Sequence, residues 1–371
     1  MDTRICQAAA LEALLPRWHR LEARCTSVPL SARMLDGPLP HAGASIVTAW
    51  EHGRLIGLWP LRVTRRGPLR IATRLGRELQ PYDGMLIAPE ADSHATAAAL
   101  WTAAQRCPAD VLRLRAVHDG TPLSALPAIS AVATPATETW WLDTGSLSDP
   151  EAVITRLSKS RRKTHRRNLR ALEKRGALAF RHLSTPTERA HAAQAALSLK
   201  RGWLEAQDLH SFALSAPWFE RGFVAAAEQG AMEVFALELD GEGIAYELGF
   251  RDPHSYRSFL GAYDPAWSSL GVGAALTAAV LQWCVRSGVS RCDLLPPSTS
   301  FKSGWCDHSA VVRSALVPLS RRGRLYGPAA DAARQLKPVY LGLSPSVRGR
   351  LNSLLRGLGT PLRQTIPKTS M

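Results

Sequence analysis

Two stretches of the chain, far apart in sequence, repeat one pattern of two apolar strands joined by a glycine turn. They are 45–63 (SIVTAWEHGRLIGLWPLRV) and 233–251 (EVFALELDGEGIAYELGFR). A turn of this kind brings its two flanking strands side by side as a hairpin. In both halves an Ala-rich helical segment and a short strand follow. The sequence therefore predicts an α/β fold (α+β, with a mixed sheet) that is built twice from similar units.

The length of 371 residues is typical of about two domains. Between the two halves, 123–139 is rich in Pro, Ala, Ser and Thr and is predicted to be the linker. We therefore expect one domain at 1–135 and a second at 140–318. A basic C-terminal extension at 319–371, expected to be helical, completes the chain.

The net charge of +15 comes from two segments. Residues 159–175 hold nine Lys or Arg and one acid, and residues 311–371 hold eleven and one, so the rest of the chain is slightly acidic. A concentration of positive charge indicates an anionic partner. Leu157, just before the first segment, and Leu169 and Leu172 within it give one apolar side, which predicts a packed helix with a cationic face.

The basic helix has two interpretations. It binds an anionic substrate group or a polyanion, or it is a solvated face. Aromatic residues, which accompany cations in many nucleic-acid-binding segments, are missing from 159–175. If the helix binds substrate, the candidate residues are Arg161, Arg162, Arg166 and Arg167.

The cysteines and the N-terminus indicate the compartment. The six cysteines form no C-x-x-C pair, so we expect reduced structural thiols and no metal site. Residues 1–15 lack a basic stretch followed by an apolar run, so no signal peptide is expected. Apolar stretches such as 272–285 are too short to span a bilayer. These features predict a cytoplasmic protein, with a peripheral position at the inner membrane surface as the alternative.

A glycine-containing turn between a predicted strand and a predicted helix is a candidate phosphate site. Glycine lets a ligand approach the backbone, and the start of a helix offers unpaired N–H groups and the positive end of its dipole. The alternative is an ordinary tight turn. The candidate donor-binding residues are Leu270, Gly271, Val272, Gly273 and Ala274.

Two other segments place cations beside aromatic residues. Lys302 lies within 301–305 (FKSGW), where its ammonium would stabilise an oxyanion during acyl transfer. Lys200, Arg201 and Trp203 lie at the end of a predicted helix, where a carboxylate or phosphate could be clamped. The alternative is that these are ordinary exposed cations of a loop and of a helix end.

Taken in order, the segments between 150 and 310 resemble the acyltransferases of the GCN5-related N-acetyltransferase (GNAT) fold. The closer resemblance is to the branch associated with bacterial cellulose and exopolysaccharide biosynthesis, which is also similar to the Fem-type aminoacyl transferases of cell-wall assembly. The resemblance is carried by SRRK at 160–163, RRNLR at 166–170, LKRGW at 199–203, LDGEGIA at 239–245, GAYDP at 261–265, GVGAAL at 271–276, CDL at 292–294 and FKSGW at 301–305.

The resemblance implies tandem GNAT-like domains, of which the N-terminal one is a degenerate copy. It implies acyl-CoA or another activated acyl donor as co-substrate, no permanently bound cofactor, and an amine acceptor in polysaccharide or cell-envelope biosynthesis. The turn 271–274 matches the pyrophosphate-binding loop. Lys302 matches the lysine to which Fem-type enzymes assign stabilisation of the intermediate. Asp293 or Tyr263 would then assist proton transfer.

Two other functions fit the same residues. One is a noncatalytic protein whose basic segments bind RNA, an anionic glycan or anionic lipid. The other is a Fem-like transferase that takes its acyl group from aminoacyl-tRNA, for which the helix at 159–175 would provide an RNA-binding surface.

Overall fold

The computed structural model describes residues 1–25, 42–76, 79, 81–207, 211, 213–214, 216–252 and 254–326. Most of the predicted C-terminal extension at 319–371 therefore lies outside the described residues. Of this extension only 319–326 is described, and 321–326 is helical. A search of the described helices finds none that is long and apolar enough to cross a membrane.

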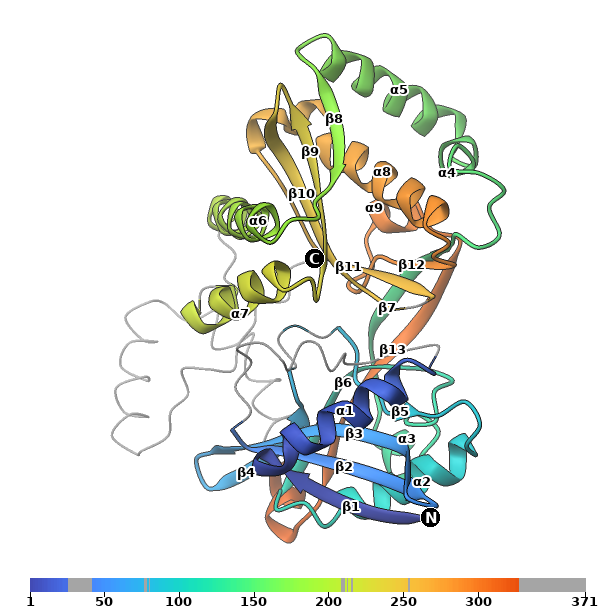
Figure 1. The fold of residues 1–371 in the computed structure, drawn as a ribbon, viewed down its shortest axis with the longest axis vertical. Coiled ribbons are helices and arrows are strands. Elements are labelled where there is room, and N and C mark those ends of the chain that lie inside the picture. The colour runs from blue at the N-terminus through green and yellow to red at the C-terminus, as the bar shows by residue number, and fades with distance from the viewer. Residues whose placement is uncertain are drawn as a thin grey trace.

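One continuous sheet runs through both halves of the described chain (Figure 1). In spatial order its strands are β1 (Asp2–Gln7), β2 (Ala44–Glu51), β3 (Arg54–Arg66), β4 (Leu69–Arg74), β6 (Val111–His118), β13 (His308–Pro318), β7 (Thr134–Asp143), β12 (Arg291–Asp293), β11 (Ser255–Tyr263), β10 (Glu242–Arg251), β9 (Glu233–Leu239) and β8 (Leu178–His182). Another strand, β5 (Leu86–Ile87), pairs with β3. The β4–β6 and β11–β12 pairs are parallel and the other pairs antiparallel, so the predicted mixed sheet is confirmed.

Helices begin where side chains satisfy the free N–H groups of a first turn. Asp92, Ser158 and Thr185 each accept such a hydrogen bond, and Thr185 completes a capping box with Glu188. The helices are α1 (Leu11–Glu22), α2 (Ser93–Ala104), α3 (Pro127–Ser130), α4 (Ala152–Thr155), α5 (Lys159–Glu173), α6 (Pro186–Ala206), α7 (Pro217–Glu228), α8 (Val272–Arg286) and α9 (Ser300–Ser303), with 3-10 helices η1 (Ala8–Ala10) and η3 (Pro265–Leu270).

The two halves repeat one arrangement, as the sequence echo predicts. In the first, the β2–β3 hairpin is followed by β4, α2 and then β6, which runs parallel to β4. In the second, the β9–β10 hairpin is followed by β11, α8 and then β12, which runs parallel to β11. Both hairpins turn through two residues with positive φ, His52-Gly53 and Asp240-Gly241, which is the geometry that suits the twist of a hairpin.

Two strands at the centre of the sheet join the halves. Along β13, Val312–Pro318 pairs with β6 of the first half and His308–Ser314 pairs with β7. The predicted linker at 123–139 is therefore wrong for its second part, because β7 starts at Thr134. Its threonines are β-branched and favour strand, and Thr139 is buried. The predicted basic helix at 159–175 corresponds to α5, which starts after the cap residue Ser158 and leaves Leu157 outside the helix.

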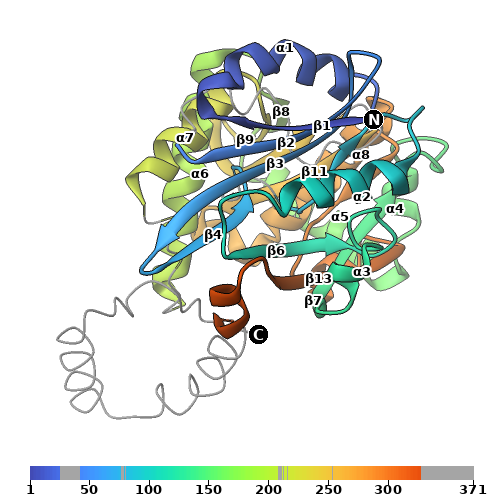
Figure 2. The same cartoon turned by 90° about the horizontal axis from the view of Figure 1, so that it is seen from below.

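Helices cover both faces of the sheet (Figure 2). One core lies beneath α1, α2, α6 and α7 and contains residues of both halves, including Trp18, Trp59 and Phe223. A second core lies beneath α5 and α8 and includes Leu172 and Leu281. Each large apolar side chain removed from water contributes roughly 1.5–3 kcal/mol. Because the first core crosses from one half to the other, its burial holds them together.

Candidate active site

The parallel strands β11 and β12 part from each other after a short pairing. They pair only over Ser255–Arg257 and Arg291–Asp293, and β11 then continues to Tyr263. A register shift between β10 and β11 leaves Phe259 as an extra residue in β11. Beyond 257, the β11 edge that faces β12 has no strand partner in the part of the chain that the structure describes. The chain then turns from the end of β11 into the first turn of α8.

The predicted glycine turn forms the start of α8. Gly271 has φ +62° in the left-handed region, which glycine adopts without steric cost. A Cβ at this position would lie 2.5 Å from the Asn168 amide nitrogen of α5. The first turn of α8 has no side-chain cap, so its backbone N–H groups stay available to a ligand.

A pocket of about 410 Å³ lies between α5, the start of α8 and α9. It brings two predicted elements together, because Arg161 of the basic helix shares its wall with Gly271 and Ala274 of the glycine turn. The rest of the wall combines aromatic and small polar groups. The lining residues are Leu157, Ser160, Arg161, Thr164, His165, Asn168, Gly271, Ala274, Ala275, Ser300, Phe301 and Trp305.

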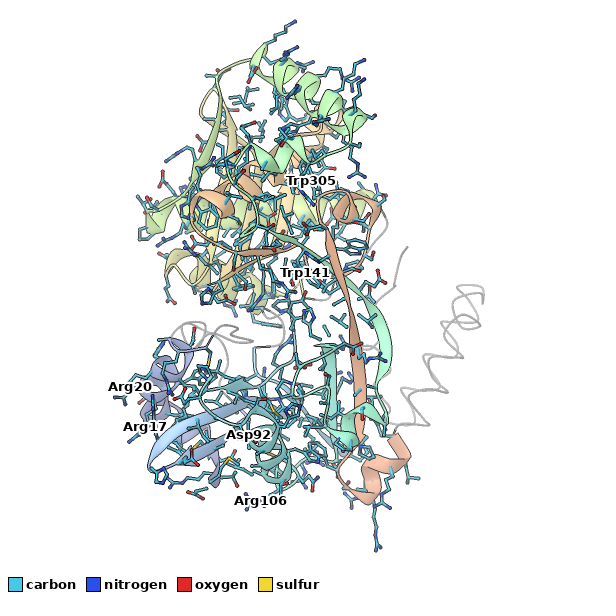
Figure 3. All side chains as sticks on the ribbon, turned by 90° about the vertical axis from the view of Figure 1, so that its right-hand side faces the viewer. Arg17, Arg20, Asp92, Arg106, Trp141 and Trp305 are labelled. Atoms are coloured by element: carbon cyan, nitrogen blue, oxygen red, sulfur yellow. The ribbon has the colours of Figure 1, made fainter. Side chains whose placement is uncertain are left out.

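Arg161 lies across the short helix α9. Its guanidinium donates to the carbonyl of Ser300 at 3.2 Å and occupies the space that a side chain at Gly304 would need. Trp305, labelled in Figure 3, packs edge-on against the His165 ring at 6.3 Å between centroids. Burial lowers the pKa of His165, which keeps the imidazole neutral near pH 7.

The other predicted cations of α5 lie away from the pocket wall. Arg162 donates to the carbonyl of Thr155 at 2.9 Å, while Arg166 and Arg167 are exposed. No ion pair joins an α5 cation to a carboxylate among the residues for which the structure gives positions. Figure 1 shows α5 at the end of the molecule farthest from the N-terminal half. Most of its Lys and Arg side chains are exposed there.

Lys302 is held by the turn that follows β12. Its Nζ donates to the carbonyl of Leu295 at 2.6 Å, and the N–H of Leu295 donates to Asp293 Oδ1 at 2.8 Å. Leu295 has φ +59°, a conformation that costs a non-glycine residue free energy. Burial lowers the pKa of Lys302 to about 8, and the charge of Asp293 opposes this decrease. The strained turn therefore fixes the lysine at a point where its charge is sensitive to pH.

Asp293 is a buried junction between the halves. Besides Leu295, it accepts hydrogen bonds from Tyr82 Oη at 2.9 Å and from Thr139 Oγ1 at 2.8 Å. Tyr82 comes from the first half and Thr139 from β7, so three distant segments converge on one carboxylate. Burial, followed by the charge of Asp293, raises the pKa of Tyr82, which keeps its hydroxyl protonated as a donor.

The remaining predicted residues are spread over two places. Tyr263 is part exposed at the end of β11, and its ring lies beside Gly273. Arg201 is engaged within the fold, donating to the Leu214 carbonyl and to Glu220, both at 2.7 Å. Lys200 lies 4.4 Å from the centre of the ring of Trp203, which is itself exposed. The structure thus brings Arg161 to the glycine turn, whereas Tyr263 and the α6 residues lie apart from that pocket wall.

The sequence prediction missed several residues of the site. Asn168 and His165 line the pocket from the same helix face as Arg161. His165 follows Arg161 by four residues and Asn168 follows His165 by three, and this spacing in the sequence could have placed all three on one face. Glu247 is a buried carboxylate on β10. Burial raises its pKa, and the positive charges of Lys302 and Lys200 oppose that rise. In the sequence, an acidic residue at a position of the predicted strand that faces inward could have identified it.

The cysteines and the possible metal ligands lie as follows. All six cysteines are free thiols, and five of them are buried. Within the ranges described above, no three His, Cys, Asp or Glu side chains gather closely enough to hold a metal ion.

Comparison with known proteins assigns the fold. Residues 159–303 match the family model described as the acetyltransferase (GNAT) domain. This segment contains α5, the glycine turn and Lys302. A comparison with curated protein sequences finds no match.

Three solved structures are similar over nearly their whole length. The crystal structure of FemX has a TM-score of 0.58 at 12% identity and covers 85% of this chain and 97% of its own. The C-terminal domain of a protein described as a lysylphosphatidylglycerol synthetase, from Agrobacterium fabrum, scores 0.53 at 14% and covers 86% and 96%. A tandem GNAT protein from the clavulanic acid biosynthesis pathway scores 0.50 at 17% and covers 86% and 99%. The predicted tandem GNAT fold is confirmed.

Proposed function

We propose that the chain, whose residues 159–303 match the model of the acetyltransferase (GNAT) domain, transfers an acyl group from acyl-CoA to an amine. The observation that carries this proposal is the pocket of about 410 Å³. There the uncapped first turn of α8 and the Arg161 guanidinium share one wall, which is the arrangement that binds a phosphate group. The donor's pyrophosphate lies at this point, against Gly271 and Ala274.

The acyl group then extends from the pocket toward the parting of β11 and β12, where Lys302 is held. The acceptor amine attacks the thioester carbonyl carbon, the carbonyl oxygen takes the electron pair, and the Lys302 ammonium stabilises the oxyanion. The C–S bond then breaks, the sulfur leaves as thiolate, and the nitrogen loses its proton. Asp293 fixes Leu295, and through it Lys302. Tyr263 is the candidate for proton transfer at the outer end of β11.

The acceptor is an amine of polysaccharide or cell-envelope biosynthesis. Support comes from the sequence resemblance to the exopolysaccharide-associated acyltransferases, which covers the same segments that form the pocket and hold Lys302. A second donor class, aminoacyl-tRNA, has one observation in its favour. The α5 cations form an unneutralised surface beside the donor pocket, and a surface of this kind attracts a polyanion.

A panel of acyl-CoA donors with amine acceptors tests the proposal. We expect turnover in the wild-type chain and strongly reduced turnover in Lys302→Ala. Arg321→Ala, which removes an exposed cation away from the pocket, is the matched control and should retain activity. Stabilisation against heat by CoA, reduced in Arg161→Ala but retained in Lys163→Ala, would locate the donor at α5. The proposal fails if no donor raises the stability and none is turned over.

Ribonuclease treatment separates the two donor classes. Activity that is supported by charged tRNA and abolished by ribonuclease identifies the aminoacyl-tRNA reaction. Activity with purified acyl-CoA that ribonuclease leaves unchanged identifies the CoA reaction. Binding of tRNA alone, with a steep dependence on salt and without turnover, would identify a noncatalytic RNA-binding protein.

A further inference from the structure

A group of exposed arginines lies at the end of the N-terminal half that is farthest from α5. Two belong to the β3–β4 hairpin, and three belong to residues 319–326, the C-terminal segment, which follows β13. Figures 1 and 2 both show the helical end of this segment beside the hairpin. We call this group the arginine surface. It consists of Arg65, Arg70, Arg321, Arg322 and Arg324.

The C-terminal segment is fixed to the hairpin through Asp110. The Asp110 carboxylate accepts hydrogen bonds from the backbone N–H of Arg70 and from the Ser320 hydroxyl, both at 2.8 Å. A Cβ at Gly323 would overlap the Asp110 carbonyl oxygen, so glycine allows the segment to pack closely against the start of β6. The arginines of the segment are therefore held at a defined place beside the hairpin.

The positive charge of the arginine surface exceeds the negative charge beside it. Arg65 and Arg70 stand directly opposite each other in the β3–β4 register, and like charges in this position destabilise a sheet. In the part of the chain with described positions, no ion pair joins any of the five arginines to a carboxylate. Asp110 supplies one negative charge, which acts on Arg70 and Arg322. An anionic partner would offset the excess.

An apolar side chain stands beside these charges. Leu325 directly follows Arg324 and is 76% exposed, more than any other large apolar side chain among the described residues. Cations beside an exposed leucine suit an anionic bilayer, where the cations meet lipid phosphates and the leucine enters the boundary of the acyl chains. Single strands of nucleic acid instead need free aromatic rings for stacking, and the Tyr326 ring is engaged with the Arg113 guanidinium.

We propose that the arginine surface and Leu325 dock the protein on a bilayer that contains anionic phospholipid. Docked in this way, the molecule has its N-terminal half at the lipid, and α5 with the donor pocket at the end that points into water (Figure 1). The sequence beyond the segment, 327–371, carries seven Lys or Arg and one acid, a composition with the same preference. This inference does not depend on the proposed acyl transfer.

Co-sedimentation of the full chain with vesicles tests the docking. We expect binding to vesicles of phosphatidylcholine and phosphatidylglycerol in equal parts, and no binding to vesicles of phosphatidylcholine alone. A triple variant that replaces Arg321, Arg322 and Arg324 by Gln should bind about a hundredfold more weakly, at about fivefold for each basic residue near an anionic surface. The three side chains are exposed, so the midpoint of thermal unfolding should not change.

The matched control removes the same charge from the opposite end of the molecule. It replaces Arg166, Arg167 and Arg170, which are exposed on α5, by Gln. Because salt screens charges that lie far from the lipid, this variant should keep its affinity for the vesicles within about twofold. Equal weakening by the two triple variants would show a general attraction of a basic chain and would overturn the proposal.

Leu325→Ser separates a bilayer from a soluble polyanion. The variant should bind the mixed vesicles severalfold more weakly, because its side chain no longer enters the lipid. Its binding to heparin, which offers negative charge without an apolar phase, should stay unchanged. Vesicle binding as strong as that of the wild-type chain would reject the bilayer as the partner.

Two further results would also overturn the proposal. One is the absence of wild-type binding to the mixed vesicles at moderate salt. The other is a larger loss of binding to single-stranded RNA than to vesicles in the triple variant of the C-terminal segment, which would identify a nucleic-acid surface. If that variant does not fold, Arg65→Gln combined with Arg70→Gln supplies the same comparison. Turnover of soluble substrates should remain at the wild-type level, so docking and acyl transfer are judged by separate measurements.

Discussion

At the scale of single residues, the protonation of Lys302 connects the fold with pH. The ammonium exists below the pKa of about 8 and is lost above it. We therefore predict that kcat/KM falls as the pH rises through about 8. Lys302→Ala should reduce kcat by roughly 10²–10³, the effect of removing one oxyanion donor. A pH–rate profile of both proteins checks this, and a wild-type decline that begins only above pH 10 would contradict it.

Gly271 provides a second test at this scale. Gly271→Ala should destabilise the chain by roughly 1–2 kcal/mol through its left-handed φ, and further through the clash with Asn168. Gly288→Ala is the matched control, because it also has positive φ but an open surrounding. Urea unfolding of both variants, and of Gly271→Ala combined with Asn168→Ala, separates the two costs. Equal destabilisation by both single variants would show that the Asn168 contact carries no cost.

At the scale of elements, the docking of α5 on α9 depends on Gly304. A Cβ at this position would displace the Arg161 guanidinium, the flexible end of a side chain, so the fold itself should lose little stability. We predict that Gly304→Ala weakens donor binding severalfold while the midpoint of thermal unfolding stays within a few degrees. Gly202→Ala, which meets no neighbour, is the control. Calorimetric titration with CoA measures the effect, and unchanged affinity would exclude Arg161 from the donor site.

The elements also show what a sequence can predict. The hairpins at His52-Gly53 and Asp240-Gly241, the helices and the glycine turn follow from local periodicity and turn chemistry. Strand β7 was missed because its first residues resemble a linker in composition, and its pairing with β13 depends on a segment far along the chain. Glu247 was missed for a related reason. Its neighbour Gly261 lies opposite it through the pairing of β10 with β11, and local patterns do not encode that register.

For the candidate site, cation positions were easier to predict than cation partners. Arg161 was expected at the site and lines the pocket. Arg201 looked equivalent in sequence, yet it is engaged with Glu220 and the Leu214 carbonyl. Asp293 was predicted to transfer protons, and its hydrogen bonds to Tyr82 and Thr139 now favour an anchoring role. The residue types indicated the chemistry, whereas the tertiary contacts determine which group is free to act.

At the scale of the whole molecule, Asp293 couples the two halves. Tyr82→Phe and Thr139→Val each remove one donor from this buried carboxylate, and each should cost roughly 1–3 kcal/mol of unfolding free energy. We predict that their effects are not additive, because both act on one acceptor. Thr102→Val, which loses only a bond within its own helix, is the control. Urea denaturation followed by two probes, one in each half, should show a single shared transition.

Strand β13 has a consequence for how the chain folds during synthesis. The N-terminal half contains β1 to β6, yet the neighbour of β6 is β13, which ends at Pro318. The ribosome therefore releases the first half with an open sheet edge that stays unpaired until nearly the whole described chain has been made. Exposed edges invite pairing with other chains. Nascent chains stalled before residue 308 should thus associate readily with a chaperone, and those released after 318 should not.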